Sequence, residues 1–294
     1  MSPDPSLGDT DLPLLSRGVI ERAAHRRTDD AWLASAWLSA RILLMDDDGR
    51  VPVDAEGRLA YVEAADAPEG ERWFLGLDVT GTPYFAVRTE VGASSSNLRQ
   101  LAMELSDVDA ELCSMALALV NWHRTHVYSP VNGERAVTSH AGWVRQPEGG
   151  PPMWPRTDPA MIVLVTDGGD RCLLARGAGR PENWYSCLAG FVEPGESAEA
   201  CVAREVFEEV GLRVHGVRYV VSQPWPFPAS LMLGFYALAD PDAPITRDPG
   251  EIADARWFTR DELRDALEGR STSMATPGGI SVAHHLMDRW VRSG

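Results

Sequence analysis

The sequence predicts an α+β protein whose N-terminal half is β-rich and whose C-terminal half is a mixed α/β domain. Short apolar runs alternate with turn clusters in residues 32–88, and apolar residues return at helical spacing in residues 98–126. Beyond residue 158, strands and a helix alternate. A chain of 294 residues with 44% hydrophobic residues is long enough for two cores.

The first domain is predicted to span residues 1–126. Its strands are expected at residues 40–45, 73–79 and 84–87, with the Asp46-Asp47-Asp48-Gly49 run as a solvated hairpin turn. Apolar residues such as Leu101, Leu105 and Leu112 predict one or two closing helices.

Residues 127–155 are rich in glycine and proline and have no sustained period, which indicates a linker or a small loop-built module. The second domain is predicted to span residues 156–294. It begins with a strand at 161–165, a turn at 167–170 and a second strand at 172–175, and a helix and further strands follow.

The composition limits the classes of ligand and location. A formal net charge of −16, from 27 basic and 43 acidic residues, repels polyanions, so extended nucleic acid is not the obvious ligand. Carboxylates that hold divalent cations would nevertheless raise the acid count of a phosphate-cleaving enzyme. The four cysteines form no CxxC pair, and no apolar window is long enough for a membrane span, so we expect a cytoplasmic protein with reduced thiols.

The most informative helix is expected at residues 198–210. Ser197 can cap its N-terminus, and Gly211 suits the left-handed position after its last turn. Glu205, Glu208 and Glu209 then stand at i, i+3 and i+4, on one face within a single turn. These like charges require a nearby cation, and carboxylate clusters favour Mg²⁺ or Mn²⁺.

The opposite face of this helix is apolar enough to pack on a sheet. Its members are Ala200, Val202, Ala203, Val206, Phe207 and Val210.

The segment 190–212 resembles the Nudix box, GX5EX7REUXEEXGU, in which U is a bulky apolar residue. Every fixed position matches, from Gly190 and Glu196 through the helix to Gly211 and Leu212. The resemblance implies a Nudix α/β/α sandwich with a mixed sheet. It also implies that two to three divalent ions are bound, with Glu196 and Arg204 as orienting partners.

A second array, at residues 222–230, reads SQPWPFPAS and resembles SQPWPFPxS of the NADH pyrophosphatase branch. Its alternating prolines exclude a regular central strand and favour a stiff, extended wall. Three further stretches resemble segments of that branch: Trp154-Pro155-Arg156-Thr157-Asp158-Pro159, Pro249-Gly250-Glu251-Ile252 and Ser281-Val282-Ala283. Trp122-His123 resembles the end of the helix before its zinc module.

The resemblance implies hydrolysis of the pyrophosphate bond of NAD(H), which gives AMP and a nicotinamide mononucleotide, by a homodimer. Glu209 is the first choice for the base, although Glu208 is not separated from it. The expected catalytic residues are Glu209, Glu208, Glu205 and Arg204. The expected metal ligands are Glu205, Glu208, Glu209, Glu251 and the carbonyl of Ala189. The expected substrate contacts are Phe191, Trp154, Gln223, Trp225, Phe227, Ser230 and Ala283, with Phe191 and Trp154 as stacking surfaces.

The chain departs from the branch in lacking the four-cysteine zinc ribbon. Ser129, Asn132, Pro147 and Gly150 occupy the approximate ligand positions, so no zinc is expected. Three alternatives stay open: a biosynthetic hydrolase of a modified NAD-derived dinucleotide, removal of NAD caps from RNA, which the net charge disfavours, and a non-catalytic dinucleotide sensor. The complete glutamate set argues against the sensor.

Overall fold

The computed structural model describes residues 12–294, so the first eleven residues of the predicted N-terminal domain lie outside the described part. The chain forms two compact units. Leu15–Thr157 and the short segment Pro224–Ala229 belong to the first. The second unit contains Asp158–Gln223, Ser230–Gly294 and the segment that ends at Leu14.

The first unit is built on a four-stranded sheet in the order β3-β1-β5-β4, in which β1 and β5 are parallel and the other pairs antiparallel. The strands are β1 (Arg41–Met45), β3 (Val62–Glu63), β4 (Arg72–Leu77) and β5 (Pro83–Arg88). The three predicted apolar runs therefore form β1, β4 and β5. The acidic run is the turn after β1, where Asp46 accepts hydrogen bonds from the backbone amides of Asp48 and Arg50.

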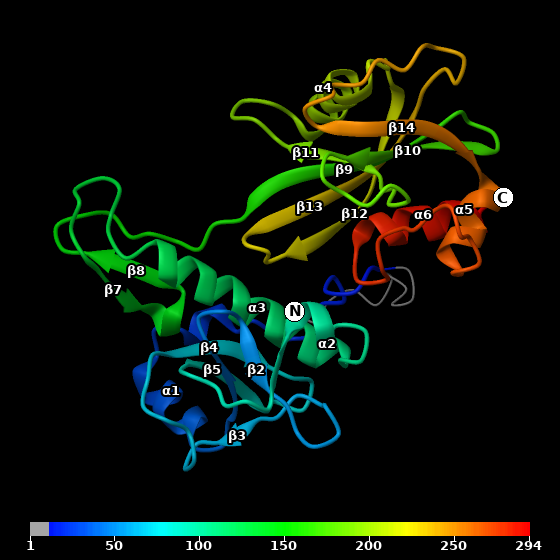
Figure 1. The fold of residues 1–294 in the computed structure, drawn as a ribbon. Coiled ribbons are helices and arrows are strands. Elements are labelled where there is room, and N and C mark those ends of the chain that lie inside the picture. Colours follow the sequence, from blue (N-terminus) through cyan, green and yellow to red (C-terminus); the bar gives the residue numbers. More distant parts are fainter. Residues whose placement is uncertain (1–11) are drawn as a thin grey trace. The chain divides into compact units, whose positions relative to one another are not determined.

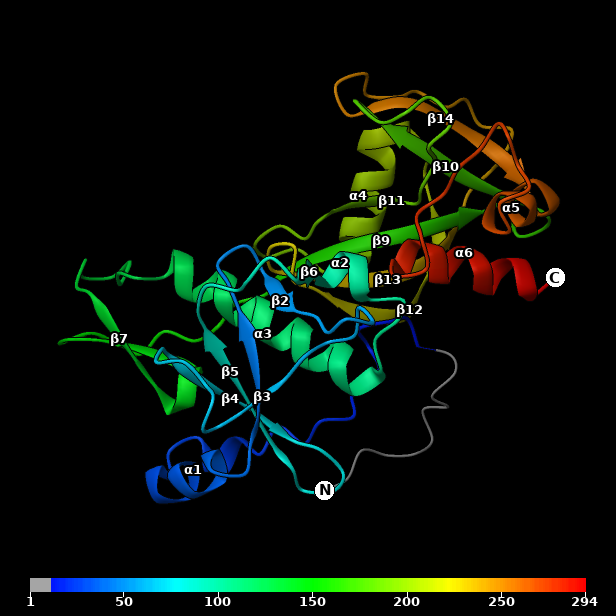
Figure 2. The same ribbon diagram turned by 60° about the horizontal axis from the view of Figure 1, so that its bottom comes forward.

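Helices cover both faces of this sheet, with α3 on one side and α1 on the other (Figures 1 and 2). The predicted closing helices are α2 (Leu98–Leu101) and α3 (Asp107–Thr125), whereas α1 (Asp30–Trp37) and the 3-10 turn Ala24–Arg26 were not predicted. Trp37 of α1 packs edge-on against Phe85 at 5.2 Å between ring centroids. On α3, the buried carboxylate of Glu111 accepts hydrogen bonds from the amides of Val19 and Ile20.

Two short two-stranded sheets complete the first unit. β2 (Arg50–Pro52) pairs with β6 (Ser95–Asn97), and β7 (Ala136–Ser139) pairs with β8 (Val144–Pro147) across the 3-10 turn His140–Gly142. The aperiodic segment 127–155 is thus an ordered module.

A buried pair, His123 and Arg145, fixes this module. Arg145 donates to Nδ1 of His123 at 3.0 Å and to the carbonyl of Ala136 at 2.8 Å. His123 Nε2 lies 2.8 Å from the carbonyl of Gly142, and its ring stacks on Trp73 at 4.6 Å. Burial lowers the pKa of His123, which agrees with a neutral ring that accepts at one nitrogen and donates at the other.

The second unit is an α/β/α sandwich around a six-stranded mixed sheet, as predicted. Its order is β12-β13-β9-β10-β14, with β11 also paired to β9, and the pair β9 and β13 is parallel. The strands are β9 (Asp158–Thr166), β10 (Arg171–Gly177), β11 (Leu188–Phe191), β12 (His215–Trp225), β13 (Ser230–Leu238) and β14 (Ile252–Thr259). The helices are α4 (Ala198–Val210), α5 (Arg260–Leu267) and α6 (Val282–Arg292).

Alternate residues of β9 enter the two cores of this sandwich. Met161, Val163 and Val165 pack in the core that contains α4, whereas Ile162 and Leu164 pack in the core that contains α5 and α6. Figure 1 shows α4 on one face of the sheet and α6 on the other. β12 lies at the edge of the sheet, where a strand tolerates Pro224, the residue before its last.

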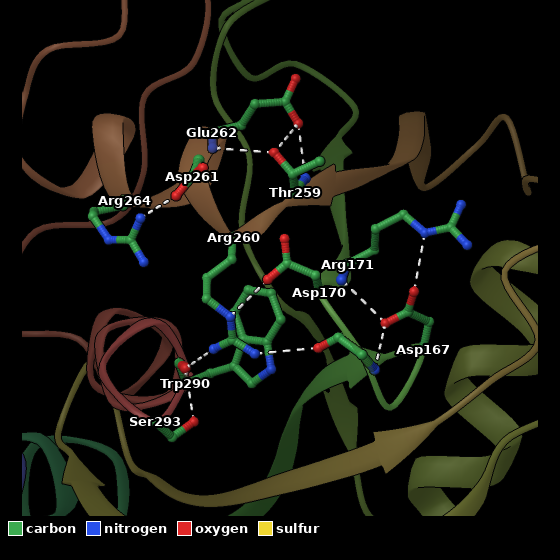
Figure 3. A network of polar contacts seen from close by, with 11 residues as sticks. Asp167, Asp170, Arg171, Thr259, Arg260, Asp261, Glu262, Arg264, Trp290 and Ser293 are labelled. Atoms are coloured by element: carbon green, nitrogen blue, oxygen red, sulfur yellow. Dashed lines mark hydrogen bonds and ion pairs between the residues drawn. The ribbon is translucent and has the colours of Figure 1, made fainter.

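Arg260 joins three elements at the C-terminal end of this unit (Figure 3). Its guanidinium lies 3.9 Å from the ring centroid of Trp290 in α6 and bonds to the carbonyl of that residue. It also donates to Asp170 at 3.0 Å and to the carbonyl of Gly169 at 3.2 Å, in the turn between β9 and β10. One side chain therefore holds the turn, α5 and α6 together.

Within residues 12–294, no helix has both the length and the apolar character that crossing a membrane requires.

Candidate active site

The helix that carries the candidate site has the predicted bounds. α4 spans Ala198–Val210, the Ser197 hydroxyl accepts a hydrogen bond from the amide of Ala200 at 3.1 Å, and Gly211 adopts φ 74°. These local signals place Glu205, Glu208 and Glu209 on adjacent positions of one turn.

The buried face of α4 differs in part from the prediction. Val202, Val206 and Val210 are buried as expected, together with Cys201. Ala200, Ala203 and Phe207 are exposed, and Arg213 lies over the Phe207 ring at 5.0 Å. The sheet covers only part of the apolar face of α4. Hydrophobic spacing in the sequence does not identify which of the apolar residues are covered.

Arg204 bonds to three carboxylates of the motif. It makes two hydrogen bonds of 2.8 Å to Glu196, and its other terminal nitrogen reaches Glu205 at 2.9 Å and Glu208 at 3.0 Å. It also donates to the carbonyl of Phe191. The hydrogen bonds from Arg204 lower the pKa of Glu196 to about 2. Part of the positive charge that the sequence required beside these glutamates is therefore supplied by the protein itself.

Glu209 lies outside this network. Its side chain is only 7% exposed, and its Oε2 is buried with no hydrogen-bond partner among residues 12–294. Burial raises the pKa of Glu209 to about 8, and the charges of Glu205 and Glu251 add to the rise. A buried acceptor without a donor is costly, and a bound cation would satisfy it and restore the ionised form.

The backbone at Gly190 lets the carboxylate of Glu205 approach closely. A Cβ placed on Gly190 would lie 2.0 Å from the carboxyl carbon of Glu205, so a larger residue there would displace the Glu205 carboxylate. Ala189, the predicted carbonyl ligand, precedes it on β11. Glu251 is exposed in the loop before β14, near enough to raise the pKa of Glu209.

The donor set fits a divalent cation, although it is not assembled as a metal cage. Among residues 12–294, no group of three or more His, Cys, Asp or Glu side chains is arranged to hold a metal ion. Arg204 engages Glu205 and Glu208 instead. Mg²⁺ or Mn²⁺ would suit this set, because all its ligand atoms are oxygens and one buried carboxylate is unsatisfied.

Both predicted stacking residues are exposed to solvent. Phe191 is 61% exposed and Trp154 is 57% exposed, so neither is a core aromatic. Trp154 contacts only the edge of His140 among the described rings, with 6.0 Å between ring centroids.

The other predicted contact residues lie deeper. Gln223 is fully buried, and its amide bonds to the carbonyl of Ile280 and the amide of Val282, both at 2.8 Å. In this structure it ties the end of β12 to the start of α6. Ser230 is buried at the start of β13, and the amide of Ala283 is bonded to the Ser281 hydroxyl.

The proline-rich loop carries the two remaining predicted residues, and its surroundings were not foreseen. Trp225 and Phe227 pack edge to face at 5.0 Å, and the guanidinium of Arg99 lies 3.9 Å from the Phe227 ring centroid. Asn121 donates to the carbonyls of Pro226 and Pro228. The sequence offered no signal for Arg99 or Asn121, because their roles arise from contacts more than a hundred residues apart.

Comparisons with known proteins agree with this geometry. A family model described as a NUDIX domain matches residues 156–275, and one described as a NADH pyrophosphatase-like rudimentary NUDIX domain matches residues 34–122. The chain is 46% identical to proteins named "NAD-capped RNA hydrolase NudC" from Mycobacterium bovis and Mycobacterium tuberculosis, over 95% of each chain. It is 36% identical to "NAD-capped RNA hydrolase NUDT12" from Homo sapiens, over 75% of this chain and 50% of that one. The predicted fold and family are thereby confirmed, and the chain belongs to the Nudix hydrolases, in the branch that carries a rudimentary Nudix domain before the Nudix domain.

Proposed function

We propose that this hydrolase cleaves the pyrophosphate bond of NAD(H) with divalent ions held by Glu205, Glu208, Glu209 and Glu251. The observation that carries the proposal is Glu209, a carboxylate buried beside two other carboxylates with an oxygen that has no partner. A merely structural glutamate would be bonded, as Glu111 is in the first unit. The Ala189 carbonyl is a further candidate ligand.

When bound, Mg²⁺ or Mn²⁺ supplies charge neutralisation of the phosphate oxygens and a lower pKa for a nearby water. The protein's own part is orientation. Glu196 fixes Arg204 through two short hydrogen bonds, and Arg204 in turn holds Glu205 and Glu208. Glu209 stays the first choice for the base, a role that requires hydrogen-bond reach of the attacking water.

The names of the relatives and the exposed aromatic rings support the choice of substrate. Phe191 and Trp154 leave more than half of their surface free for stacking, and stacking on an aromatic side chain contributes about 1–3 kcal/mol per base. NADH should therefore be cleaved with a higher kcat/KM than ADP-ribose, which lacks the second base-like ring. The products are AMP and the reduced nicotinamide mononucleotide.

Removal of NAD caps from RNA is the second candidate, and the names of the relatives favour it. The net charge of −16 makes RNA a less favoured substrate than a free dinucleotide. A whole-chain charge, however, does not describe the local potential at one site. The same pyrophosphate bond is cleaved in both substrates.

The oligomeric state, the zinc content and the location are proposed from the resemblance to the family and from the state of the cysteine and histidine side chains. We propose a homodimer without structural zinc that works in the cytoplasm. All four cysteines are free and buried, which suits a reducing compartment. Both ring nitrogens of His123 are hydrogen-bonded inside the protein, so this residue offers no lone pair to zinc.

The test is a substrate panel with Mg²⁺ or Mn²⁺: NADH, NAD⁺, ADP-ribose and an NAD-capped RNA, with products separated by chromatography. NADH or the capped RNA should give the highest kcat/KM, and Trp154→Ala should narrow the gap to ADP-ribose. If ADP-ribose is the best substrate of the wild type, the proposed substrate class is wrong even if the metal chemistry stands.

A further inference from the structure

The proline-rich loop has few means of holding its own shape. Pro224, Pro226 and Pro228 have no backbone N–H, and one described backbone hydrogen bond lies within the loop, from the amide of Phe227 to the carbonyl of Trp225 at 2.7 Å. The carbonyls of the loop must therefore find donors elsewhere.

Asn121 supplies those donors from α3. Its side-chain nitrogen lies 3.0 Å from the carbonyl of Pro226 and 2.9 Å from that of Pro228. A primary amide has two N–H groups, so a single side chain satisfies both carbonyls. These two carbonyls flank Phe227, which fixes the backbone on both sides of the aromatic residue.

Apolar packing does not hold the loop in place by itself. A cavity of about 370 Å³ lies beside it, lined by Leu98, Leu117 and Asn121 together with Pro226, Phe227 and Pro228. Arg99 covers the Phe227 ring and lies 5.0 Å from the centroid of Trp225. The space leaves one side of the loop without packing, and the two hydrogen bonds of Asn121 are directional contacts at that side.

We propose that Asn121 is a positioning residue for the dinucleotide, which it affects by fixing the proline-rich loop. The inference rests on the proposed function and on the expectation from the sequence that Trp225 and Phe227 of this loop contact the substrate. Loss of Asn121 should weaken substrate binding and leave the pyrophosphate chemistry of α4 in place.

The test compares Asn121→Asp and Asn121→Ala with the matched control Asn132→Asp. Asn132 also donates its amide to a carbonyl, that of Glu148 at 3.1 Å, in the same unit and away from the loop. Melting curves first establish that each variant is folded. Steady-state kinetics with NADH then separate KM from kcat, and hydrogen–deuterium exchange follows the peptide that contains residues 222–230.

Both Asn121 variants should raise KM for NADH by about tenfold while kcat changes by less than about twofold. Exchange at the loop amides should become faster in these variants and stay unchanged in Asn132→Asp. Unchanged KM and unchanged loop exchange in folded Asn121 variants would overturn the inference, as would equal changes in the control. If the wild type cleaves no NAD-type substrate, the proposed function fails, and the exchange measurement still decides whether Asn121 fixes the loop.

Discussion

Replacing Glu209 with glutamine should abolish hydrolysis and, at the same time, stabilise the metal-free protein at alkaline pH. The carboxylate is 7% exposed, and burial together with the charges of Glu205 and Glu251 raises its pKa to about 8 from a usual value of 4.5. An ionised Glu209 without a bound cation therefore lowers the stability of the folded protein. The neutral amide of the glutamine variant carries no such cost.

The sign and size of the effect follow from linkage. A carboxyl with a raised folded-state pKa favours the folded state below its unfolded pKa and loses that advantage as the pH rises through the folded value. The variant should therefore gain about 1–2 kcal/mol over wild type near pH 5.5 and about 4–5 kcal/mol at pH 9. For a domain of this size, the larger gain corresponds to a rise in Tm on the order of 10 °C.

The assay is thermal melting in the presence of a chelator at both pH values, with hydrolysis measured in parallel. Glu208→Gln is the control, because Glu208 is exposed and bonded to Arg204. It should lose activity without the alkaline gain in Tm. An equal Tm difference at both pH values would refute the reasoning about burial. Retention of more than about a tenth of wild-type kcat by both variants would refute the site, since tenfold is only ~1.4 kcal/mol.

Three other predictions follow from the same structure. Gly190→Ala should lower kcat/KM at least about tenfold with the fold intact by circular dichroism, because its Cβ would displace the Glu205 carboxylate; near-normal activity would exclude that close approach in the working enzyme. Arg260→Ala should lower the free energy of unfolding in urea by about 2–3 kcal/mol without changing KM, because it removes the Trp290 contact and the bonds to the β9–β10 turn. The purified protein should hold no stoichiometric zinc by elemental analysis, and a strong chelator should leave its melting curve unchanged in the absence of substrate; one zinc per chain with cooperative unfolding on its removal would contradict this.

The elements that were predicted well are those with local signals. The bounds of α4 follow from Ser197, Gly211 and the spacing of the glutamates, all within one segment of sequence. The exposure of Phe191 and Trp154 was compatible with the sequence but not determined by it.

The elements that were missed depend on contacts between distant residues. The module at 127–155 has no period, and the buried pair His123–Arg145 that fixes it is separated by 22 residues. Gln223 was predicted as a substrate contact, and the sequence offered no sign that its amide also bonds to Ile280 and Val282 inside the fold. No propensity or spacing rule reports such partners, because the tertiary fold brings them together.

The bonds of Arg204 to three glutamates bear on how the protein survives when metal is scarce. Many small metalloproteins unfold when their ion is withdrawn, because the ligands have nothing else to bind. Here the guanidinium of Arg204 already supplies part of the positive charge beside the glutamates, so an ion that bound at Glu205 or Glu208 would replace one cation with another. If the proposed metal site is correct, the protein should therefore stay folded when its divalent ion is withdrawn, and activity should return when the ion is added back.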